Sequence, residues 1–354
     1  MEQQLDQDRM DAFAERALGI INGAGLGFVL SVGHRTGLFD SMAGMAPATA
    51  AAIAEAAGLR ERYVREWLNG ATVGRVVDHD PEYGTYWLPP EHAAFLTRAA
   101  GVDNLAFQAQ YLSMFGLVED DIVTCFRDGG GVPYSRFPAF QALMAEESAA
   151  AYDAALVDGV LPLVPGLVER LKAGIDVADV GCGQGHAINV MASAFPGSRF
   201  TGLDLSEEAI SVARAEAARL GLSNATFEVL DIAALTGAYD LVTGFDIVHD
   251  QARPREVLTA IHQALRPGGV FLCADIAGSS KVHENLDHPI GPWLYTVSLF
   301  HCMTVSLAYD GEGLGTMWGE DLALQYFAEA GFRVEEPRHV DGDPVNVYYV
   351  CHPG

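Results

Sequence analysis

A glycine-rich loop, Gly181-Cys-Gly-Gln-Gly185, carries the strongest chemical signal in the sequence and directly follows the apolar run Val177–Val180. Glycine tolerates positive φ angles and lets a ligand approach the backbone without a Cβ in the way. The spacing G-x-G-x-G differs from the G-x-G-x-x-G of dinucleotide sites, and Asp179 stands just before the loop. A carboxylate at that point disfavours a phosphate and suits a ligand that carries an ammonium group.

Two further acids stand where the next two apolar runs end. Asp204 ends the first of them, roughly 20 residues beyond Gly185, where a carboxylate can accept hydrogen bonds from both hydroxyls of a ribose. Asp231 ends the second and can accept from the exocyclic amine of a purine whose face lies against Ile232. Each acid alone is typical of a solvated loop, but three in order behind the glycine loop predict a nucleoside-containing ligand.

His249 is the first candidate for a general base. It follows the apolar run Tyr239–Phe245, so we expect it at the same rim of the sheet as the glycine loop. Neutral imidazole can accept a proton near pH 7. The alternative is a histidine that caps the helix near Pro254. His186, directly after the glycine loop, is expected to begin a helix rather than to act as a base.

A second candidate acid or base, His301, lies in the apolar stretch Ile290–Leu307. This segment can cover the active site as an insert, or it can be an ordinary core or dimer helix, because pockets and cores share their composition. Cys302 has only its neighbour His301 at ligand spacing, so we expect no metal site. The aromatic residues expected to contact a substrate from this region are Trp293, Tyr295 and Trp318.

Apolar runs and helical stretches alternate from Val177 onward, which is typical of a parallel sheet with helices on both faces. Ser206 can cap the helix Glu207–Leu220, and Pro254 suits the first turn of the helix Arg255–Leu265. The expected strands are Val177–Val180, Phe200–Leu203, Thr226–Leu230, Tyr239–Val242 and Val270–Ala274.

The N-terminal third predicts a winged helix. A helix over Thr49–Ala57 ends at Gly58, an amphipathic helix around Trp67 follows, and Val73–Val77 with Thr85–Leu88 form a hairpin. Residues 47–97 hold four arginines and no lysine against seven acids. Because DNA binding needs a basic face, we expect this domain to support dimerisation and to cap the active site rather than to bind nucleic acid.

Composition narrows the class of protein further. The chain has 354 residues, 50% of them hydrophobic, with a formal net charge of −26 that would repel nucleic acid. Its five cysteines are widely spaced, which favours a reducing, cytoplasmic location. The uncharged stretch Ala17–Gly33 barely reaches membrane-spanning length. We therefore expect a buried helix at an interface or in a core, most simply the contact of a homodimer.

Residues 175–275 resemble a class I S-adenosyl-L-methionine-dependent methyltransferase, with the run from Asp179 to Gly185 as its first motif. The resemblance implies a Rossmann-like α/β sheet of seven strands whose last strand is antiparallel, with Phe332–Val340 and Val345–Cys351 as strands six and seven. It implies that Asp204 binds the ribose and Asp231 the adenine amine of that cofactor. The full expected cofactor-binding set is Asp179, Gly181, Cys182, Gly183, Asp204, Leu205, Asp231, Ile232 and Phe245.

The whole chain resembles a bacterial family of winged-helix methyltransferases related to small-molecule O-methyltransferases. The stretches that carry this likeness are Gly129–Tyr134, Phe245–Gln251, Leu294–Ser298 and His301–Leu307. In the O-methyltransferases a His-Asp-Trp triplet holds the catalytic histidine, and here the triplet is His249-Asp-Gln251.

The resemblance also implies which residues line the substrate pocket near the methyl donor. They are Tyr134, Phe140 and Met144, and the alternative is that these residues pack in the core of the linker helices. The glycine run Gly129–Gly131 before them suggests a mobile segment that gates entry.

These observations predict a winged-helix domain over residues 1–98, a helical linker and lid over 99–174, and a methyltransferase domain over 175–354 with a substrate-covering insert at about 277–331. The predicted activity is methyl transfer from S-adenosyl-L-methionine to a small molecule, most simply to a hydroxyl that His249 deprotonates. Three alternatives remain: transfer to nitrogen, carbon or sulfur without an essential base, a cofactor-binding transcriptional regulator, and a scaffold that catalyses a reaction without methyl transfer.

Overall fold

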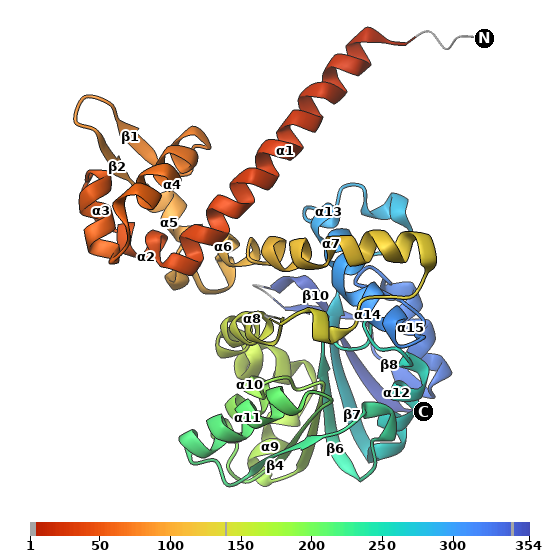
Figure 1. Ribbon diagram of the computed structural model, residues 1–354. Helices are drawn as coiled ribbons and strands as arrows, with labels where there is room; N and C mark the ends of the chain where they lie inside the picture. The colour runs from red at the N-terminus through yellow and green to blue at the C-terminus, as the bar shows by residue number, and fades with distance from the viewer. Residues whose placement is uncertain (1–4, 139, 341–342) are drawn as a thin grey trace. The chain divides into compact units, whose positions relative to one another are not determined.

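A computed structural model describes residues 5–138, 140–340 and 343–354. The chain divides into two compact units, Met1–Gly116 and Leu117–Gly354, and each is described by itself (Figure 1). The first unit contains α1 (Gln7–Thr36), α2 (Leu38–Met42), α3 (Ala50–Ala57), α4 (Glu61–Val73), β1 (Asp78–Asp80), β2 (Thr85–Trp87), α5 (Pro90–Leu96) and α6 (Leu105–Gln108).

The winged-helix prediction is confirmed in its helices and corrected in its hairpin. The Thr49 side chain caps α3 by accepting from the Ala52 amide, and Gly58 ends it in the left-handed conformation. Val73–Val77 is not a strand, because α4 extends to Val73 and Val77 turns into the core with 1% exposure. The first strand of the hairpin is instead β1, which pairs antiparallel with β2.

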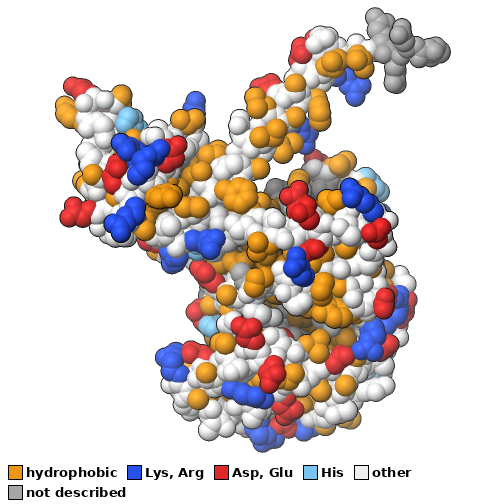
Figure 2. All heavy atoms as spheres, in the orientation of Figure 1, with side chains coloured by type: hydrophobic (Ala, Val, Ile, Leu, Met, Phe, Trp, Pro, Cys, Tyr) orange, Lys and Arg blue, Asp and Glu red, His pale blue; other side chains and the backbone are white. Residues whose placement is uncertain are grey.

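Helix α1 departs most from expectation. It runs for 30 residues, and only Ser31, Gly33 and His34 are buried along it. Figure 2 shows hydrophobic side chains exposed along its visible face. Among the described residues it is the one helix long and apolar enough to cross a membrane, by length and composition alone. Of the two alternatives expected for Ala17–Gly33, a core position is excluded within this unit, whereas an interface stays a prediction.

The second unit holds an α/β sheet whose strand order is β5-β4-β3-β6-β7-β10-β8, with β9 also paired to β10. The five strands from β3 to β7 run parallel, and β10 runs antiparallel to β7. The strands are β3 (Asp176–Val180), β4 (Arg199–Asp204), β5 (Ala225–Val229), β6 (Tyr239–Phe245), β7 (Leu265–Ile276), β8 (Phe332–Val334), β9 (Arg338–Val340) and β10 (Asp343–Pro353).

This topology confirms the predicted doubly wound sheet with an antiparallel last strand. The segment expected as strand six is divided into β8 and β9, since Pro337 lies between them and cannot donate a ladder hydrogen bond. The sheet therefore has eight strands rather than seven.

Helices cover both faces of the sheet. One face packs against helices that carry Met191 and Ile210, and the other against helices that carry Ile261 and Phe327. The helices of this unit are α7 (Tyr111–Asp128), which begins at the boundary, α8 (Phe140–Ala155), α9 (Leu167–Ala173), α10 (His186–Ala194), α11 (Glu207–Leu220), α12 (Pro254–Ala264), α13 (Gly291–Val297), α14 (Met303–Ala308) and α15 (Glu320–Glu329).

Candidate active site

The glycine loop follows β3 and is shaped by its three glycines, whose φ angles are +67° at Gly181, +52° at Gly183 and +77° at Gly185. A Cβ on Gly181 would lie 2.5 Å from Ile247, and one on Gly185 would lie 2.4 Å from the Phe227 ring. At Gly183 the nearest atom would be 3.8 Å away. The outer two glycines are therefore needed for packing, while Gly183 leaves backbone open to a ligand.

Asp204, at the end of β4, ties this loop to the neighbouring strand. Its Oδ2 accepts from the Gly183 amide at 2.9 Å, and its Oδ1 accepts from the Ser206 amide at 2.8 Å. Burial raises the pKa of this carboxyl, although the amide hydrogen bonds oppose the rise. The predicted ribose-binding carboxylate thus lies directly beside the open part of the loop.

Asp179 lies inside β3 rather than against the loop surface. It is 3% exposed and accepts from the Thr243 hydroxyl at 2.6 Å. Burial raises its pKa to about 7, the Thr243 hydrogen bond opposes this, and the charge of Asp204 adds to it. A cation bound nearby would favour the ionised carboxylate.

The other expected cofactor residues lie in different environments. Asp231 caps the short helix η5 (Ile232–Ala234) through the Ala233 amide, and its second oxygen pairs with Arg253 at 2.8 Å. Ile232 is 4% exposed and belongs to the core, and Phe245 packs against Tyr152 with ring centroids 5.2 Å apart. Leu205 is exposed, and Cys182, within the glycine loop, is half-buried.

His249 forms a buried pair with Asp275 at the end of β7. The distance from His249 Nδ1 to Asp275 Oδ1 is 2.6 Å, and the residues are 4% and 0% exposed. Burial alone would lower the pKa of His249, but the charges of Asp275 and Cys302 and their side-chain hydrogen bonds outweigh it and raise the pKa well above its usual value. The pair orients the ring and stabilises its protonated form.

Asp275 was not predicted from the sequence. Its position at the carboxyl end of a strand is the same signal that marked Asp204 and Asp231. The sequence does not show that β7 pairs with β6. This pairing brings Asp275 next to His249, which lies 26 residues earlier in the chain.

His301 lies in η7 (Ser298–Cys302), a π-helical turn between α13 and α14. Its ring stacks on Phe140 with centroids 3.9 Å apart and meets Tyr134 and Phe137 edge-on at 5.5 and 4.8 Å. Burial, together with the charge of His249, lowers its pKa to about 3. The structure thus brings both candidate histidines to one region, with His301 neutral.

Two predicted substrate contacts, Tyr134 and Phe140, therefore lie with this histidine. The Tyr134 hydroxyl also donates to Asp250 at 2.5 Å, which links the segment before α8 to the loop that carries His249. Burial, and then the charge of Asp250, raise the pKa of Tyr134 well above its usual value.

The other residues predicted to contact a substrate differ in their burial and in their partners. Trp318 is 3% exposed, packs edge-on against Tyr326 and belongs to the core that contains residues of α15. It is therefore a core residue rather than a substrate contact. Tyr295 is partly exposed and its hydroxyl accepts from Asn285 at 3.0 Å. Met144 and Trp293 are half-buried, on α8 and α13.

Within residues 5–138, 140–340 and 343–354, no group of three or more His, Cys, Asp or Glu side chains is arranged for a metal ion.

Two family models match the chain. Residues 24–98 match a family described as an Rv2258c-like winged HTH domain, and residues 171–325 match a methyltransferase domain. These matches agree with the two units of the fold.

Comparison with characterised sequences finds ubiquinone biosynthesis O-methyltransferases. The protein from Cereibacter sphaeroides is 34% identical over 112 residues, which cover 30% of this chain and 44% of that protein. The protein from Cronobacter sakazakii is 35% identical over 126 residues, covering 34% and 51%. The chain thus spans about half the length of these relatives.

Solved structures match over nearly the whole chain. The mitomycin 7-O-methyltransferase MmcR has a TM-score of 0.73 at 18% identity, covering 98% of this chain and all of that one. Human N-acetylserotonin methyltransferase, solved in complex with SAM, has a TM-score of 0.70 at 18% identity and full coverage of both chains. At this level of identity the likeness establishes a shared fold.

Proposed function

We propose that this chain, which joins a winged-helix domain to a class I methyltransferase domain, transfers the methyl group of S-adenosyl-L-methionine to a hydroxyl oxygen of a small molecule. The observation that carries the proposal is the buried His249–Asp275 pair, because a histidine held by a carboxylate at the ligand-binding edge of the sheet is suited to general-base catalysis.

The residues around the glycine loop fit this cofactor. Gly183 offers open backbone, and Asp179 adds negative charge. Each oxygen of Asp204 accepts from one backbone amide and can accept from a ribose hydroxyl as well. When bound, S-adenosyl-L-methionine supplies a methyl group activated by a positively charged sulfur. A site rich in carboxylates suits that positive charge.

His249 would act on the acceptor. Its Nδ1 is held by Asp275, so Nε2 is left to take the proton of the acceptor hydroxyl, which would replace the hydrogen bond between His249 and Cys302. The carboxylate then stabilises the imidazolium that forms. The rings of Tyr134, Phe140 and His301 provide an aromatic wall beside this base, which supports an aromatic acceptor.

Binding and methyl transfer test the proposal directly. Calorimetry should show that wild type binds S-adenosyl-L-methionine and S-adenosylhomocysteine, and that Asp204→Ala loses at least about tenfold in affinity because its ribose contacts are gone. Glu228→Ala removes an exposed acid from the adjacent strand β5 and should bind as wild type does. A panel of phenols can then be screened for release of S-adenosylhomocysteine.

A folded wild type that binds neither ligand would overturn the methyltransferase proposal. Binding without any methylated product from any acceptor class would favour a scaffold or a regulator instead. An undiminished rate in His249→Ala would favour transfer to an acceptor that needs no base.

The proposal includes a homodimer formed through α1. Its exposed apolar residues Leu18, Ile21, Phe28 and Val32 follow one another at spacings of three, seven and four, which places them on one stripe of the helix. Such a stripe is costly to leave in water, and a second copy of the same helix can cover it. All five cysteines are free thiols, which supports a reducing, cytoplasmic location, and the acidic charge favours a partner other than nucleic acid.

A further inference from the structure

Five carboxylates gather at the carboxyl edge of the sheet, and His249 is the one basic side chain among the donors that reach them. Each is buried or half-buried, and the donors that reach them are backbone amides, hydroxyls, an amide side chain and His249. In the described part of the chain, no lysine or arginine pairs with any of them. They are Asp179, Asp204, Asp246, Asp250 and Asp275.

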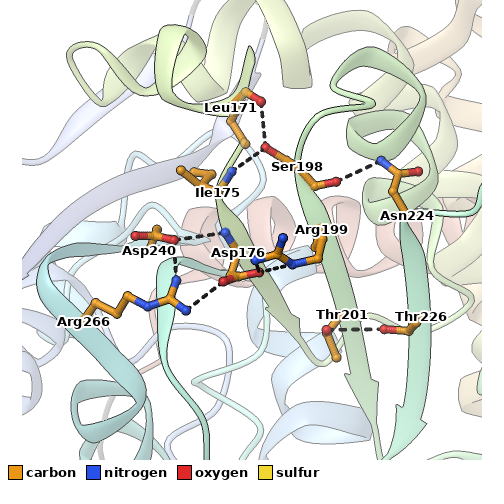
Figure 3. Close-up of polar contacts among 10 residues, drawn as sticks. All are labelled: Leu171, Ile175, Asp176, Ser198, Arg199, Thr201, Asn224, Thr226, Asp240 and Arg266. Carbon is orange, nitrogen blue, oxygen red and sulfur yellow. Dashed lines mark hydrogen bonds and ion pairs between the residues drawn. The ribbon is translucent and has the colours of Figure 1, made fainter. Parts of the chain in front are cut away.

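The opposite edge of the same sheet is built differently, as Figure 3 shows. Asp176 and Asp240, at the starts of β3 and β6, are both bound by Arg266, at 2.7 and 2.5 Å. Arg199 adds a second contact to Asp176 at 2.6 Å. The chain therefore neutralises the acids at the amino ends of β3 and β6 with arginines, whereas the acids at the carboxyl ends of β3, β6 and β7 have His249 as their one basic neighbour among the described residues. Because an unpaired buried carboxylate is costly, that asymmetry indicates a ligand.

Three polar atoms around His249 lack any hydrogen-bond partner within the described residues. They belong to Asp246 (Oδ1), Asp275 (Oδ2) and His301 (Nε2). Asp275 is 0% exposed and holds His249, while His301 is 2% exposed and lies close enough to His249 for its charge to act on it. Burial, and then the charge of Asp275, raise the pKa of Asp246 to about 8, whereas the charge of His249 opposes the rise, so a bound cation would favour the ionised carboxylate.

Asp246 is the member best placed to hold a charged group. It follows β6 in the left-handed conformation, with a φ of +55° that few residues other than glycine, asparagine and aspartate adopt. Tyr152 and Tyr348 lie near enough for its charge to act on their hydroxyls. Its Oδ1 lacks a donor among the described residues, so it can accept a hydrogen bond from an ammonium group.

The cofactor carries two positive charges, on its sulfonium and on its ammonium group, and we assign them to the first two of these acids. Asp179 and Asp204 flank the glycine loop, where the nucleoside and its sulfonium are expected. Asp246 and Asp275 instead end the next two strands, on the side of His249, where the acceptor must present its hydroxyl.

We infer that the methyl acceptor is a hydroxylated molecule carrying a protonated amine, and that Asp246 binds its ammonium group while the hydroxyl faces His249. The inference rests on the proposed function and names its substrate class. Acceptors that carry a carboxylate or a phosphate are disfavoured, because five acids and no lysine or arginine partner meet them at this edge.

Three phenols of similar shape separate charge from fit: tyramine is cationic, 4-ethylphenol is neutral and 4-hydroxyphenylacetate is anionic. Their affinities are measured by calorimetry on full-length protein saturated with S-adenosylhomocysteine. We expect tyramine to bind about tenfold or more tightly than 4-ethylphenol, and 4-hydroxyphenylacetate to bind most weakly.

Asp246→Asn is the matched variant, because asparagine keeps the shape and tolerates the positive φ angle while it removes the charge. Its tyramine affinity should fall to that of 4-ethylphenol, with the affinity for S-adenosylhomocysteine within about twofold of wild type. Glu228→Gln, on exposed β5, should retain the preference for tyramine.

The outcomes separate this inference from the proposed function. Loss of S-adenosylhomocysteine binding in wild type would overturn the methyltransferase itself. If wild type binds S-adenosylhomocysteine but does not prefer tyramine, or prefers 4-hydroxyphenylacetate, only the inference that the acceptor carries an amine is overturned. If Asp246→Asn weakens S-adenosylhomocysteine as much as tyramine, Asp246 belongs to the cofactor site and the inference is wrong. Should this variant not fold, the ranking of the three phenols by wild type decides alone.

Discussion

At the scale of single residues, the charge on His249 is set by two opposing effects. Burial favours the neutral ring, whereas the adjacent Asp275 carboxylate favours the protonated ring and prevails. A general base must be unprotonated to accept a proton. The rate should therefore fall as pH drops through a pKa that lies above that of an ordinary histidine.

Asp275→Asn should move this acidic limb to lower pH, because the variant no longer stabilises the imidazolium. The maximal rate should fall roughly 100-fold, since the ring loses its orienting carboxylate. A pH profile of kcat/KM with the acceptor found in the phenol screen measures both effects, and NMR titration of His249 measures the pKa without an acceptor.

His283→Gln is the control, because His283 is exposed and lies outside the site. Its profile should match that of wild type. An acidic limb that stays in place in Asp275→Asn would mean that His249 is not the titrating base.

At the scale of elements, the segment from Gly129 to Pro133 is held against α14. The Val132 amide donates to the hydroxyl and to the carbonyl of Thr304, at 2.9 and 3.1 Å. A Cβ on Gly131 would lie 1.9 Å from that carbonyl oxygen and 2.4 Å from the Ala308 nitrogen. Close approach to a helix thus explains this glycine more directly than the mobile gate that the sequence suggested.

Gly131→Ala should destabilise the protein by about 2–4 kcal/mol, because the backbones of the segment and α14 must separate. Gly130→Ala has open space around its Cβ and meets only the strain of its +80° φ angle, so it should cost about 1–2 kcal/mol. Urea unfolding of both variants measures the difference. Equal losses would show that the contact with α14 does not decide the stability of this segment.

At the scale of the whole molecule, the exposed stripe on α1 should control the oligomeric state. Leu18 and Ile21 are 60% and 68% exposed, so exchanging both for glutamate changes no core contact. We expect wild type to sediment as a dimer and Leu18→Glu/Ile21→Glu to sediment as a monomer, because four introduced charges would meet across the interface.

Analytical ultracentrifugation measures the mass, and calorimetry with S-adenosylhomocysteine verifies that the methyltransferase unit is unchanged. A monomeric wild type would contradict the dimer. Recovery of wild type in the membrane fraction would assign the same stripe to lipid instead.

Much of the architecture was accessible from the sequence because its signals are local. The Ser206 cap was predicted and is seen, with the side chain accepting from the Ala209 amide. The helix Glu207–Leu220 has the predicted bounds. Glycine spacing and acids at strand ends likewise act within a few residues, so the loop and Asp204 could be placed without knowing the rest of the fold.

Other features depend on which distant segments become neighbours. Three of the five residues in the segment Val73–Val77 are valines, yet a helix end and the core decide its conformation. Arg253 pairs with Asp231, and Trp318 packs in the core rather than lining a substrate pocket. Propensity and spacing alone do not report such contacts, because tertiary packing overrides them.

The sequence by itself determined the doubly wound sheet, the glycine loop and the candidate base, since each is encoded by residues close together in the chain. Only the tertiary structure decided that Asp275 is the partner of His249, that His301 is a buried neutral ring beside Phe140, and that α1 stays uncovered in its own unit. The physical reason is that strand order and burial arise from the joint packing of distant segments, and the electrostatics of the site follow from them.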